Sequence, residues 1–348
     1  MADITVDLVS DTATRPGAAM REAMAHALVG DEQRGEDPSV NELNARVAEL
    51  LGQEASIFLP SGTMCNQIAL AVHCRPGDQI IAADSAHIIT SEGAGAAVFA
   101  GSMVRAIACD RGIFSAEELR SAMGGAGVKA PRPRVVAVEQ TSNRGGGTIW
   151  PLDILAEVVE AARELNCRLH MDGARLMNAV IATGVEAHRY AAPFDSVWID
   201  LSKGLGCPVG GVLAGSAAFI AEATVWKHRF GGAMRQAGIL AAAGLYALDH
   251  NIERLANDHE NARAFASRLA ALPGVSLQNR EIETNLVFFD VSGTGLTAPE
   301  ISSQLRKQGV RIGVESKYLM RAVFHLDVRA EAVGLAADAL AHALALNE

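Results

Sequence analysis

The chain has few cysteines, no run of more than two basic residues and no long apolar stretch. Its five cysteines are odd in number and lack metal-ligand spacing, so they predict reduced thiols, with neither a disulfide framework nor a metal centre. Acidic residues number 40 and basic residues 30, and the net charge of −10 argues against nucleic acid or an anionic membrane as partner. Residues 239–248, the longest apolar stretch, fall short of the roughly 20 needed to span a bilayer, and the N-terminus lacks a basic and apolar leader. These absences predict a cytoplasmic protein.

The composition favours a folded protein with a sizeable core. Hydrophobic residues make up 49% of the chain and charged residues 20%, which argues against disorder. A length of 348 residues suits one large and one smaller domain. The pattern changes after residue 244, so we predict a large domain over residues 1–245, with an N-terminal arm, and a small domain over 246–348.

Short apolar runs alternate with helical stretches from about residue 55 to residue 214. The predicted strands are 56–59, 79–83, 103–108, 135–139, 168–172, 196–201 and 211–214. The predicted helices between them are 64–73, 115–123, 152–165 and 174–182. This alternation predicts an α/β fold with a mostly parallel, seven-stranded sheet between helices. In such sheets ligands bind beyond the carboxyl ends of the strands.

The last hundred residues predict a smaller α+β domain. A long helical region runs to residue 272, where Pro273 and Gly274 end it. Strands near 285–291 and 322–326 and helices at 298–308 and 330–346 follow.

Lys203 and Asp172 are the most informative residues of the chain. Lys203 stands among glycines just after a buried strand, where an amine can form a Schiff base with an aldehyde cofactor. Asp172 ends the preceding strand, where a carboxylate can keep a pyridine nitrogen protonated. Arg175 opens the next helix, within reach of the same ring. Each residue alone also fits an ordinary turn, but together they predict pyridoxal phosphate.

Two segments are candidates for binding the phosphate of this cofactor. Ser61, Gly62 and Thr63 lie between a strand and a helix, where backbone N–H groups bind anions. A simple helix cap explains the same residues. Arg235 follows a glycine pair before a later helix and is a second candidate.

His87 and Arg321 are candidates for contacts with the cofactor ring and the substrate. His87 follows the strand at 79–83, and an imidazole there could stack on the ring and transfer protons. Arg321 lies on a predicted strand of the small domain, where a guanidinium can bind a substrate carboxylate in a bidentate manner. A buried structural histidine and a surface arginine remain the alternatives.

The joint pattern resembles the low-specificity L-threonine aldolases, which belong to the fold-type-I pyridoxal-phosphate enzymes and the β-eliminating lyase superfamily. The resemblance extends from about Asp7 to Val328 and rests on several ordered motifs. They are Asp7-Leu8-Val9-Ser10-Asp11-Thr12-Ala13-Thr14-Arg15-Pro16, Gly35-Glu36-Asp37-Pro38, Leu59-Pro60-Ser61-Gly62-Thr63, Ala86-His87 with Glu92-Gly93, His170-Met171-Asp172-Gly173-Ala174-Arg175, Leu201-Ser202-Lys203-Gly204-Leu205-Gly206, Gly232-Ala233-Met234-Arg235-Gln236 and His325-Leu326-Asp327-Val328.

The resemblance implies a role for each candidate residue. Lys203 would be the Schiff-base lysine, Asp172 would contact the ring nitrogen, and His87 would stack on the ring. Arg175 would lie near the phenolic oxygen of the ring. The remaining implied contacts are Gly62, Thr63 and Arg235 with the phosphate, and Ser10 and Arg321 with the substrate carboxylate. The resemblance also implies a homo-oligomer, a dimer of dimers, in which residues 35–38 reach a neighbouring active site.

The chain departs from the family pattern around the side chain of the substrate. Arg34 stands where relatives commonly have tyrosine, and Lys129 where a histidine often lies near the substrate hydroxyl. Glu139-Gln140-Thr141-Ser142-Asn143 replaces the more common Glu-Asn-Thr-His-Asn. Arg34 and Lys129 are therefore predicted substrate-binding residues, and they favour an acidic or strongly polar β-substituent, as in 3-hydroxyaspartate.

The predicted activity is cleavage of L-threonine, L-allo-threonine or another L-β-hydroxy-α-amino acid to glycine and an aldehyde. Lys203, His87 and Asp172 are the predicted catalytic residues. Two alternatives remain open. One is a related reaction with the same cofactor, namely β-elimination, racemisation or transamination on a substrate such as phenylserine. The other is a non-catalytic protein that binds pyridoxal phosphate.

Overall fold

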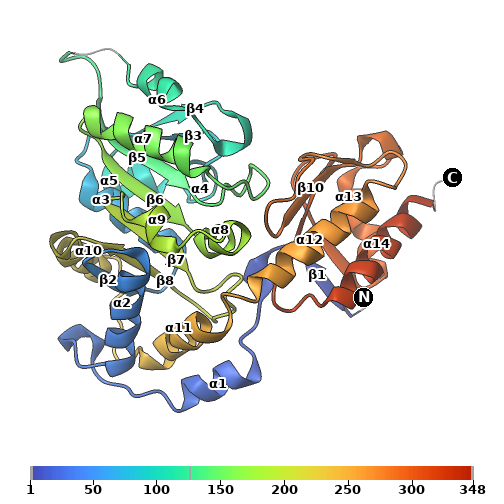
Figure 1. Ribbon diagram of the computed structural model, residues 1–348, viewed down its shortest axis with the longest axis horizontal. Helices are drawn as coiled ribbons and strands as arrows, with labels where there is room; N and C mark the ends of the chain where they lie inside the picture. The colour runs from blue at the N-terminus through green and yellow to red at the C-terminus, as the bar shows by residue number, and fades with distance from the viewer. Residues whose placement is uncertain (1–2, 125–126, 346–348) are drawn as a thin grey trace.

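The computed structural model describes residues 3–124 and 127–345. They form a large α/β domain and a smaller α+β domain, which lie side by side in Figure 1. The helix α12, Leu255–Leu269, runs from the large domain into the small one.

The large domain is built on a seven-stranded sheet in the order β2-β8-β7-β6-β5-β3-β4. The strands are β2 (Ala55–Leu59), β3 (Asp78–Ala83), β4 (Met103–Ile107), β5 (Arg132–Glu139), β6 (Arg168–Gly173), β7 (Ser196–Asp200) and β8 (Gly211–Gly215). Only β8 runs against its neighbours, pairing antiparallel with both β2 and β7. All seven predicted strands are present, and the predicted mostly parallel sheet is confirmed.

Helices cover both faces of this sheet, because its strands are apolar on both sides. One face packs against α2 (Pro38–Leu51), α6 (Ala116–Ala122), α7 (Leu152–Glu164), α8 (Leu176–Thr183), α9 (Ala187–Ala191) and α11 (Gly238–His250). The other packs against α3 (Gly62–His73), α4 (His87–Thr90), α5 (Gly95–Ala100) and α10 (Ala217–Arg229). The helix α1, Ala18–Ala25, lies against α11. The result is a three-layer domain whose loops gather at the two ends of the strands.

The small domain contains a five-stranded sheet in the order β1-β11-β12-β10-β9. Its elements are β1 (Val6–Leu8), β9 (Ser276–Leu277), β10 (Leu286–Asp290), β11 (Val310–Val314), β12 (Leu319–Val323), α13 (Ala298–Lys307) and α14 (Ala330–Ala345). Short 3-10 turns lie at Asp11–Ala13, Glu32–Arg34, Asp110–Gly112 and Ser292–Thr294. One face of the sheet packs against α12, α13 and α14.

Three features of this part differ from the sequence prediction. The strand β1 comes from the N-terminus and pairs in parallel with β11, so the N-terminal segment joins the small sheet. The strand predicted at 322–326 begins earlier, as β12. The boundary predicted at residue 245 falls inside α11, whose residues Ala241, Ala243 and Ala247 belong to the core of the large domain. Strand pairing places β1 in the small domain, and core packing places α11 in the large domain. The periodicity of a sequence does not reveal such long-range contacts.

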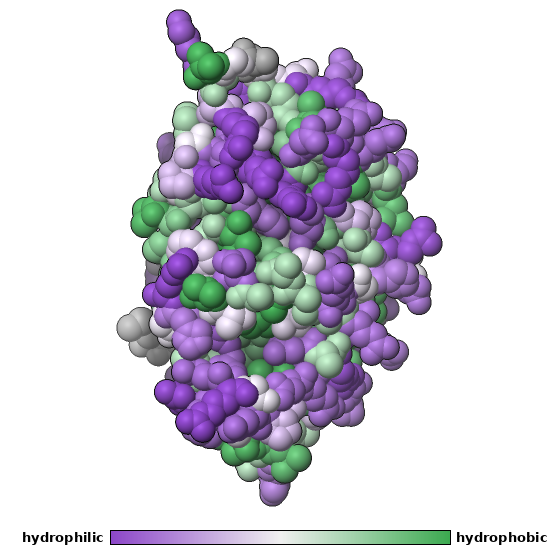
Figure 2. Space-filling view, turned by 90° about the vertical axis from the view of Figure 1, so that its left-hand side faces the viewer, coloured by the Kyte–Doolittle hydropathy of each residue, from purple (hydrophilic) through white to green (hydrophobic). Residues whose placement is uncertain are grey.

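The surface is consistent with the composition. Figure 2 shows the large-domain end of the molecule as mostly hydrophilic, with apolar residues scattered among polar ones. Within the described ranges, no helix combines the length and apolar character that crossing a membrane requires.

The small domain depends on a cluster of aromatic side chains, and this generates a prediction. Phe265 of α12 is fully buried, with its ring centroid 5.4 Å from Phe324 and 6.3 Å from Phe289. We expect Phe265→Ala to lower the free energy of unfolding by about 3–5 kcal/mol, because it leaves a cavity in a core that cannot fully collapse. Urea denaturation of the full-length protein, monitored by circular dichroism, measures this change.

The matched control is Leu335→Ala on α14, since Leu335 is 60% exposed. We expect that variant to change stability by less than about 0.5 kcal/mol. Equal effects of the two substitutions would contradict the assigned core.

Candidate active site

Residues from five strand ends converge on one cavity of about 240 Å³. Ser61 follows β2, His87 follows β3, Thr141 follows β5, Asp172 belongs to β6 and Lys203 follows β7. Because these strands are parallel, their carboxyl ends meet at one edge of the sheet. The cavity therefore lies where the sequence predicted the site, and it brings Gly62, Thr63, His87, Asp172, Arg175 and Lys203 together.

Lys203 lies in this cavity with little exposure to solvent. Its side chain is 16% exposed, and its Nζ lies 3.5 Å from the Asp200 carboxylate and 5.9 Å from the centre of the Trp198 ring. Its backbone carbonyl accepts a 2.9 Å hydrogen bond from the hydroxyl of Thr14, so the N-terminal segment helps to hold the lysine loop. The amine is thus held inside the cavity and next to a counter-ion.

Asp172 is linked to His87 by a buried hydrogen-bond network. The amide of Asn66 donates to Asp172 Oδ2 at 2.8 Å and to Glu92 Oε1 at 2.7 Å. His87 Nδ1 lies 2.8 Å from the same Glu92 oxygen. The oxygen of Asn66 accepts from the indole of Trp198 at 2.7 Å, which fixes the orientation of the amide. The network therefore holds the carboxylate and the imidazole in fixed positions on the cavity wall.

The same cluster has perturbed proton affinities. Burial raises the pKa of Glu92 and of Glu139, and the neighbouring Asp172 charge acts in the same direction on both. The hydrogen bond to Glu92 raises the pKa of His87, and the charge of Asp172 adds to this. Glu139 accepts hydrogen bonds from the backbone N–H groups of His87 and Asn143, both at 2.7 Å. A histidine that keeps its proton above its usual range is suited to proton transfer.

Arg175 forms a buried bidentate ion pair with Asp11. Its Nε and Nη2 each donate to a different oxygen of Asp11 at 2.8 Å, and both side chains are almost completely buried. Asn285 of the small domain donates to the same carboxylate at 3.3 Å. Burial alone would raise the pKa of Asp11, but Arg175 overcomes this and lowers it to about 2. Arg175 thus lines the cavity while holding the N-terminal segment and the small domain to the large one.

The segment Ser61–Thr63 has the geometry of a helix N-terminus. Ser61 is the N-cap of α3, and its hydroxyl accepts from Met64 N at 3.3 Å. A Cβ on Gly62 would lie 2.2 Å from the Trp198 ring, so only glycine lets the helix start this close to the cavity. The free N–H groups of the first turn are therefore available to an anion.

Arg321 and Ser10 each contact a residue that lines the cavity, and the hydroxyl of Ser10 accepts a 2.8 Å hydrogen bond from Thr12, one of the lining residues. Arg321 Nη1 donates to the side-chain oxygen of Asn143, a cavity residue, at 3.2 Å, and its Nη2 donates to the carbonyl of Val9 at 3.4 Å. Its Nε lies 3.0 Å from Glu315. Burial lowers the pKa of Arg321, and the nearby Arg175 and Arg144 charges also lower it. A partly desolvated guanidinium at this position is suited to binding a carboxylate.

Five predicted site residues do not line the cavity of this chain: Ser10 and Arg321 contact residues that do, while Arg34, Lys129 and Arg235 lie farther away. Arg34 and Arg235 both approach Asp31, at 3.7 Å and 3.0 Å, and both are exposed. Lys129 is exposed in the loop before β5, at the amino end of a strand whose carboxyl end lines the cavity. Their predicted contacts with cofactor and substrate stay predictions.

Several site residues were not singled out from the sequence. They are Asp11, Asn66, Asp200, Trp198 and Thr14. The position of Asp200 at the carboxyl end of β7, three residues before Lys203, was the one local signal. Asp11 binds Arg175 and Asn66 binds Asp172, in each case across more than 100 residues, so no local pattern reveals these contacts.

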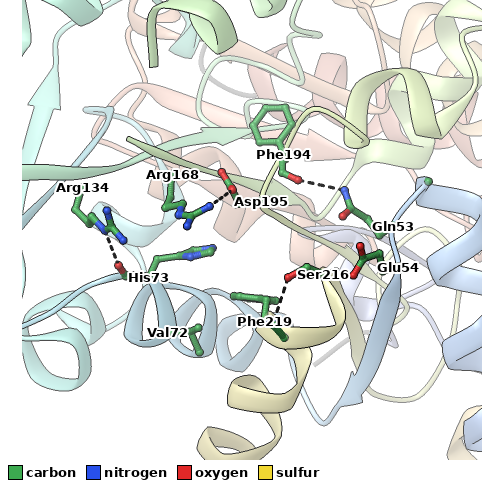
Figure 3. A pocket seen from close by; sticks show the side chains of 12 residues that line it. Gln53, Glu54, Val72, His73, Arg134, Arg168, Phe194, Asp195, Ser216 and Phe219 are labelled. Atoms are coloured by element: carbon green, nitrogen blue, oxygen red, sulfur yellow. Dashed lines mark hydrogen bonds and ion pairs between the residues drawn. The ribbon is translucent and has the colours of Figure 1, made fainter. Parts of the chain in front are cut away.

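A larger cavity of about 490 Å³ lies at the other end of the strands (Figure 3). Its polar groups are engaged with each other: Arg168 with Asp195, Arg134 with the His73 carbonyl, and Glu54 with the N–H of Ala217. Burial lowers the pKa of His73 to about 4, so this histidine is neutral near pH 7. No lysine is among its described lining residues, so this cavity does not offer the amine that Lys203 provides in the smaller one.

Comparison with known proteins identifies the family. The model of the β-eliminating lyase family matches residues 7–292. A low-specificity L-threonine aldolase from Escherichia coli K12 is 40% identical over 327 residues, which cover 94% of this chain and 95% of that protein. Low-specificity L-threonine aldolase 1 from Arabidopsis thaliana is 38% identical over 326 residues, which cover 92% and 91%. The chain belongs to the low-specificity L-threonine aldolase family.

Solved structures confirm the fold. A threonine aldolase from Leishmania major superposes with a TM-score of 0.83 at 20% identity, covering 97% of this chain and 99% of that one. A serine palmitoyltransferase from Sphingomonas wittichii superposes with a TM-score of 0.77 at 18% identity, covering 97% and 87%. Since proteins with such different names share this fold, the fold alone does not select the reaction.

The residues of the cavity fit pyridoxal phosphate. Lys203 provides an amine for the aldehyde, Asp172 a carboxylate for the ring nitrogen, and Ser61–Thr63 a helix N-terminus for the phosphate. Family membership confirms the dependence on pyridoxal phosphate that the sequence predicted.

The ion pair between Asp11 and Arg175 generates a pH-dependent prediction. We expect Asp11→Asn to lower the free energy of unfolding by about 3–5 kcal/mol near pH 7, because it leaves Arg175 buried without its counter-charge. The folded-state pKa of Asp11 is depressed from 3.8 to about 2, so its contribution is complete above pH 3.8 and declines as the pH falls toward 2. That decline corresponds to about 2 kcal/mol.

Urea unfolding of both proteins at a series of pH values measures this difference. Asp338→Asn is the control, because Asp338 forms an exposed ion pair with Arg268. A wild-type advantage that stays constant from pH 5 to 2 would refute the assigned coupling.

Proposed function

We propose that this protein is a pyridoxal-phosphate-dependent aldolase. It cleaves L-threonine, L-allo-threonine or a related L-β-hydroxy-α-amino acid at the Cα–Cβ bond, giving glycine and an aldehyde. The observation that carries the proposal is the placement of Lys203 and Asp172 in one cavity, in a chain 40% identical to a low-specificity L-threonine aldolase. The same residues are therefore proposed as the catalytic centre, together with His87.

The bound cofactor would supply a protonated ring that takes up the electron pair released when the Cα–Cβ bond breaks. Lys203 would hold the cofactor through a bond between Nζ and the aldehyde carbon of the cofactor. Asp172 would keep the ring nitrogen of the cofactor protonated. Asn66 keeps Asp172 in place through its 2.8 Å hydrogen bond. The N-terminus of α3 would bind the phosphate through Gly62 and Thr63.

Arg321 and Ser10 would bind the substrate carboxylate and so decide which bond of the α-carbon is aligned for cleavage. Val9 and Asn143 position the guanidinium of Arg321 from two sides. Alignment matters because the bond that breaks has to stand perpendicular to the ring system.

His87 would accept or return the proton of the β-hydroxyl group. Its Nδ1 is engaged with Glu92 at 2.8 Å, which leaves Nε2 as the nitrogen that can exchange a proton with the substrate. The side chain is 35% exposed, so it has access to the cavity while being anchored at one end.

The neighbouring subunit is proposed to complete the site in a homo-oligomer, a dimer of dimers. Support comes from the exposed position of Arg34 and Arg235, which gather at Asp31 away from the cavity of their own chain. Both would reach a partner's cofactor and substrate, together with Lys129 and residues 35–38. A cytoplasmic location is also proposed, and the support for it is that all five cysteines are free thiols.

Lys203→Ala tests the central assignment. We expect the purified variant to show no visible absorbance from lysine-bound cofactor and to lose nearly all glycine formation, because no other amine takes the place of Nζ in the cavity. Absorption spectra after incubation with pyridoxal phosphate, and chromatographic assay of glycine and acetaldehyde from threonine, measure both.

Lys307→Ala, on the exposed side of α13, is the control and should behave as the wild type. Normal turnover in Lys203→Ala would overturn the proposal. Formation of a 2-oxo acid by the wild type, without glycine, would replace the aldolase by β-elimination or transamination.

Arg321→Ala tests the carboxylate contact. We expect KM for threonine to rise by about tenfold to a hundredfold, since a charge-assisted contact is lost, while the affinity for the cofactor changes little. Steady-state kinetics give KM, and titration with pyridoxal phosphate gives cofactor affinity. Arg306→Ala on α13 is the control. A loss of cofactor affinity as large as the change in KM would place Arg321 in the cofactor site.

A further inference from the structure

A second cavity at the carboxyl edge of the sheet lies between the two domains, next to the active site. Its volume is about 440 Å³. Ser85 follows β3, Cys109 follows β4, and Arg144 follows β5, while Asn279 and Arg280 come from the small domain. The two cavities share a wall, because Asn143 lines the active site and Arg144 lines this cavity.

The cavity gathers positive charge in a chain whose net charge is −10. Arg111, Arg144 and Arg280 line it, against Asp110 as the one acidic residue among the described lining residues. Arg111 pairs with Glu283. Across residues 3–124 and 127–345, Arg144 and Arg280 have no carboxylate within ion-pair distance. Two guanidinium groups, one from each domain, are therefore available to a ligand.

Hydrogen bonds between the domains hold the walls of this cavity. Asn279 Nδ2 donates to the carbonyl of Gly145 at 2.8 Å, and Thr284 donates to the carbonyl of Gly147 at 2.9 Å. Glu283, besides binding Arg111, accepts from Ile149 N at 2.9 Å. A side chain at Gly145 would collide with the backbone of Arg111, since its Cβ would lie 2.0 Å from the carbonyl oxygen. The cavity is thus an organised site.

Polar atoms in its wall lack partners. The hydroxyl of Ser85 and the Nε of Arg111 are buried, and neither has a hydrogen-bond partner within the part of the chain that the structure describes. Buried polar groups are normally paired, because an unpaired one costs about 1–3 kcal/mol. Both belong to residues that line the cavity, but neither atom has surface open to a ligand, so the groups that a ligand reaches are the exposed guanidinium groups of Arg144 and Arg280.

We propose that this cavity binds a small multivalent oxyanion, a phosphate or a dicarboxylate, between Arg144 of the large domain and Arg280 of the small domain. Guanidinium groups form paired hydrogen bonds with phosphate and carboxylate oxygens. The cavity differs from the cofactor's phosphate site, which lies at the N-terminus of α3.

The bound anion would act on the active site through their common wall. Arg144 directly follows Asn143, whose side-chain oxygen accepts from Arg321 at 3.2 Å. An anion that holds Arg144 and Arg280 also holds the two domains in one relative position. Arg321 belongs to the small domain, so its position over the cavity becomes more defined when the anion binds.

Calorimetric titration of the cofactor-loaded enzyme tests the proposal. Inorganic phosphate and malonate are titrated separately in a chloride buffer, with the cofactor retained so that its own phosphate site stays filled. We expect one site per chain in the wild type. Arg144→Gln and Arg280→Gln should each weaken binding about tenfold or more, because each removes a charge-assisted contact, and the double variant should show no binding.

Arg105→Gln is the matched control. Arg105 is an exposed arginine of β4, four residues before Cys109, and it does not line the cavity. We expect it to bind as the wild type does. Thermal unfolding gives a second readout: the anion should raise Tm of the wild type and of Arg105→Gln, and leave the double variant unchanged.

The two anions distinguish the chemistry of the ligand. Binding of phosphate alone identifies a phosphoryl compound, and binding of malonate alone identifies a dicarboxylate. Binding of neither anion, or equal binding by wild type and double variant, overturns the proposal. Calorimetry reads binding without turnover, so this result is independent of whether the protein proves to be an aldolase.

Discussion

The buried ion pair between Arg175 and Asp11 is the interaction on which the active site depends. It joins the start of α8 in the large domain to the N-terminal segment, and Asn285 adds the small domain to the same carboxylate. That segment in turn binds the lysine loop through Thr14 and lies against Arg321 through Val9. A buried ion pair is stable only when its hydrogen bonds are short and well aligned. The pair therefore fixes the relative positions of the large domain, the N-terminal segment and the small domain.

A second constraint is the orientation of one amide. Asn66 lies in α3 and binds Asp172, Glu92, His170 and Trp198 at once. Because the amide donates only through its nitrogen, its two carboxylate partners lie on one side and the two ring N–H donors on the other. Asn66 therefore positions Asp172 directly and His87 through Glu92. Trp198 also explains Gly62, since no side chain fits between the indole and the start of α3.

The succession of strands and helices in the large domain could be predicted from the sequence for a physical reason. Its strands are buried on both faces and therefore appear in the sequence as short apolar runs. Helices lie between most consecutive strands of this domain. Lys203, Asp172, His87 and Ser61 each directly follow or end a strand, so the sequence alone predicted that they meet at one edge. The small domain was harder to predict, because β1 and β11 pair across 300 residues and β12 is displaced from its expected position.

The sequence by itself determined the fold class and the cofactor, and it predicted Lys203, Asp172 and His87, which the structure places in one cavity. These follow from short-range patterns: apolar periodicity, glycines beside a lysine, and polar residues at strand ends. Tertiary structure decided what those residues touch. The pairing of Arg175 with Asp11, the network around Asn66 and the gathering of three arginines between the domains each join residues far apart in the chain. Their energies depend on distance and burial in three dimensions, and a linear sequence carries neither.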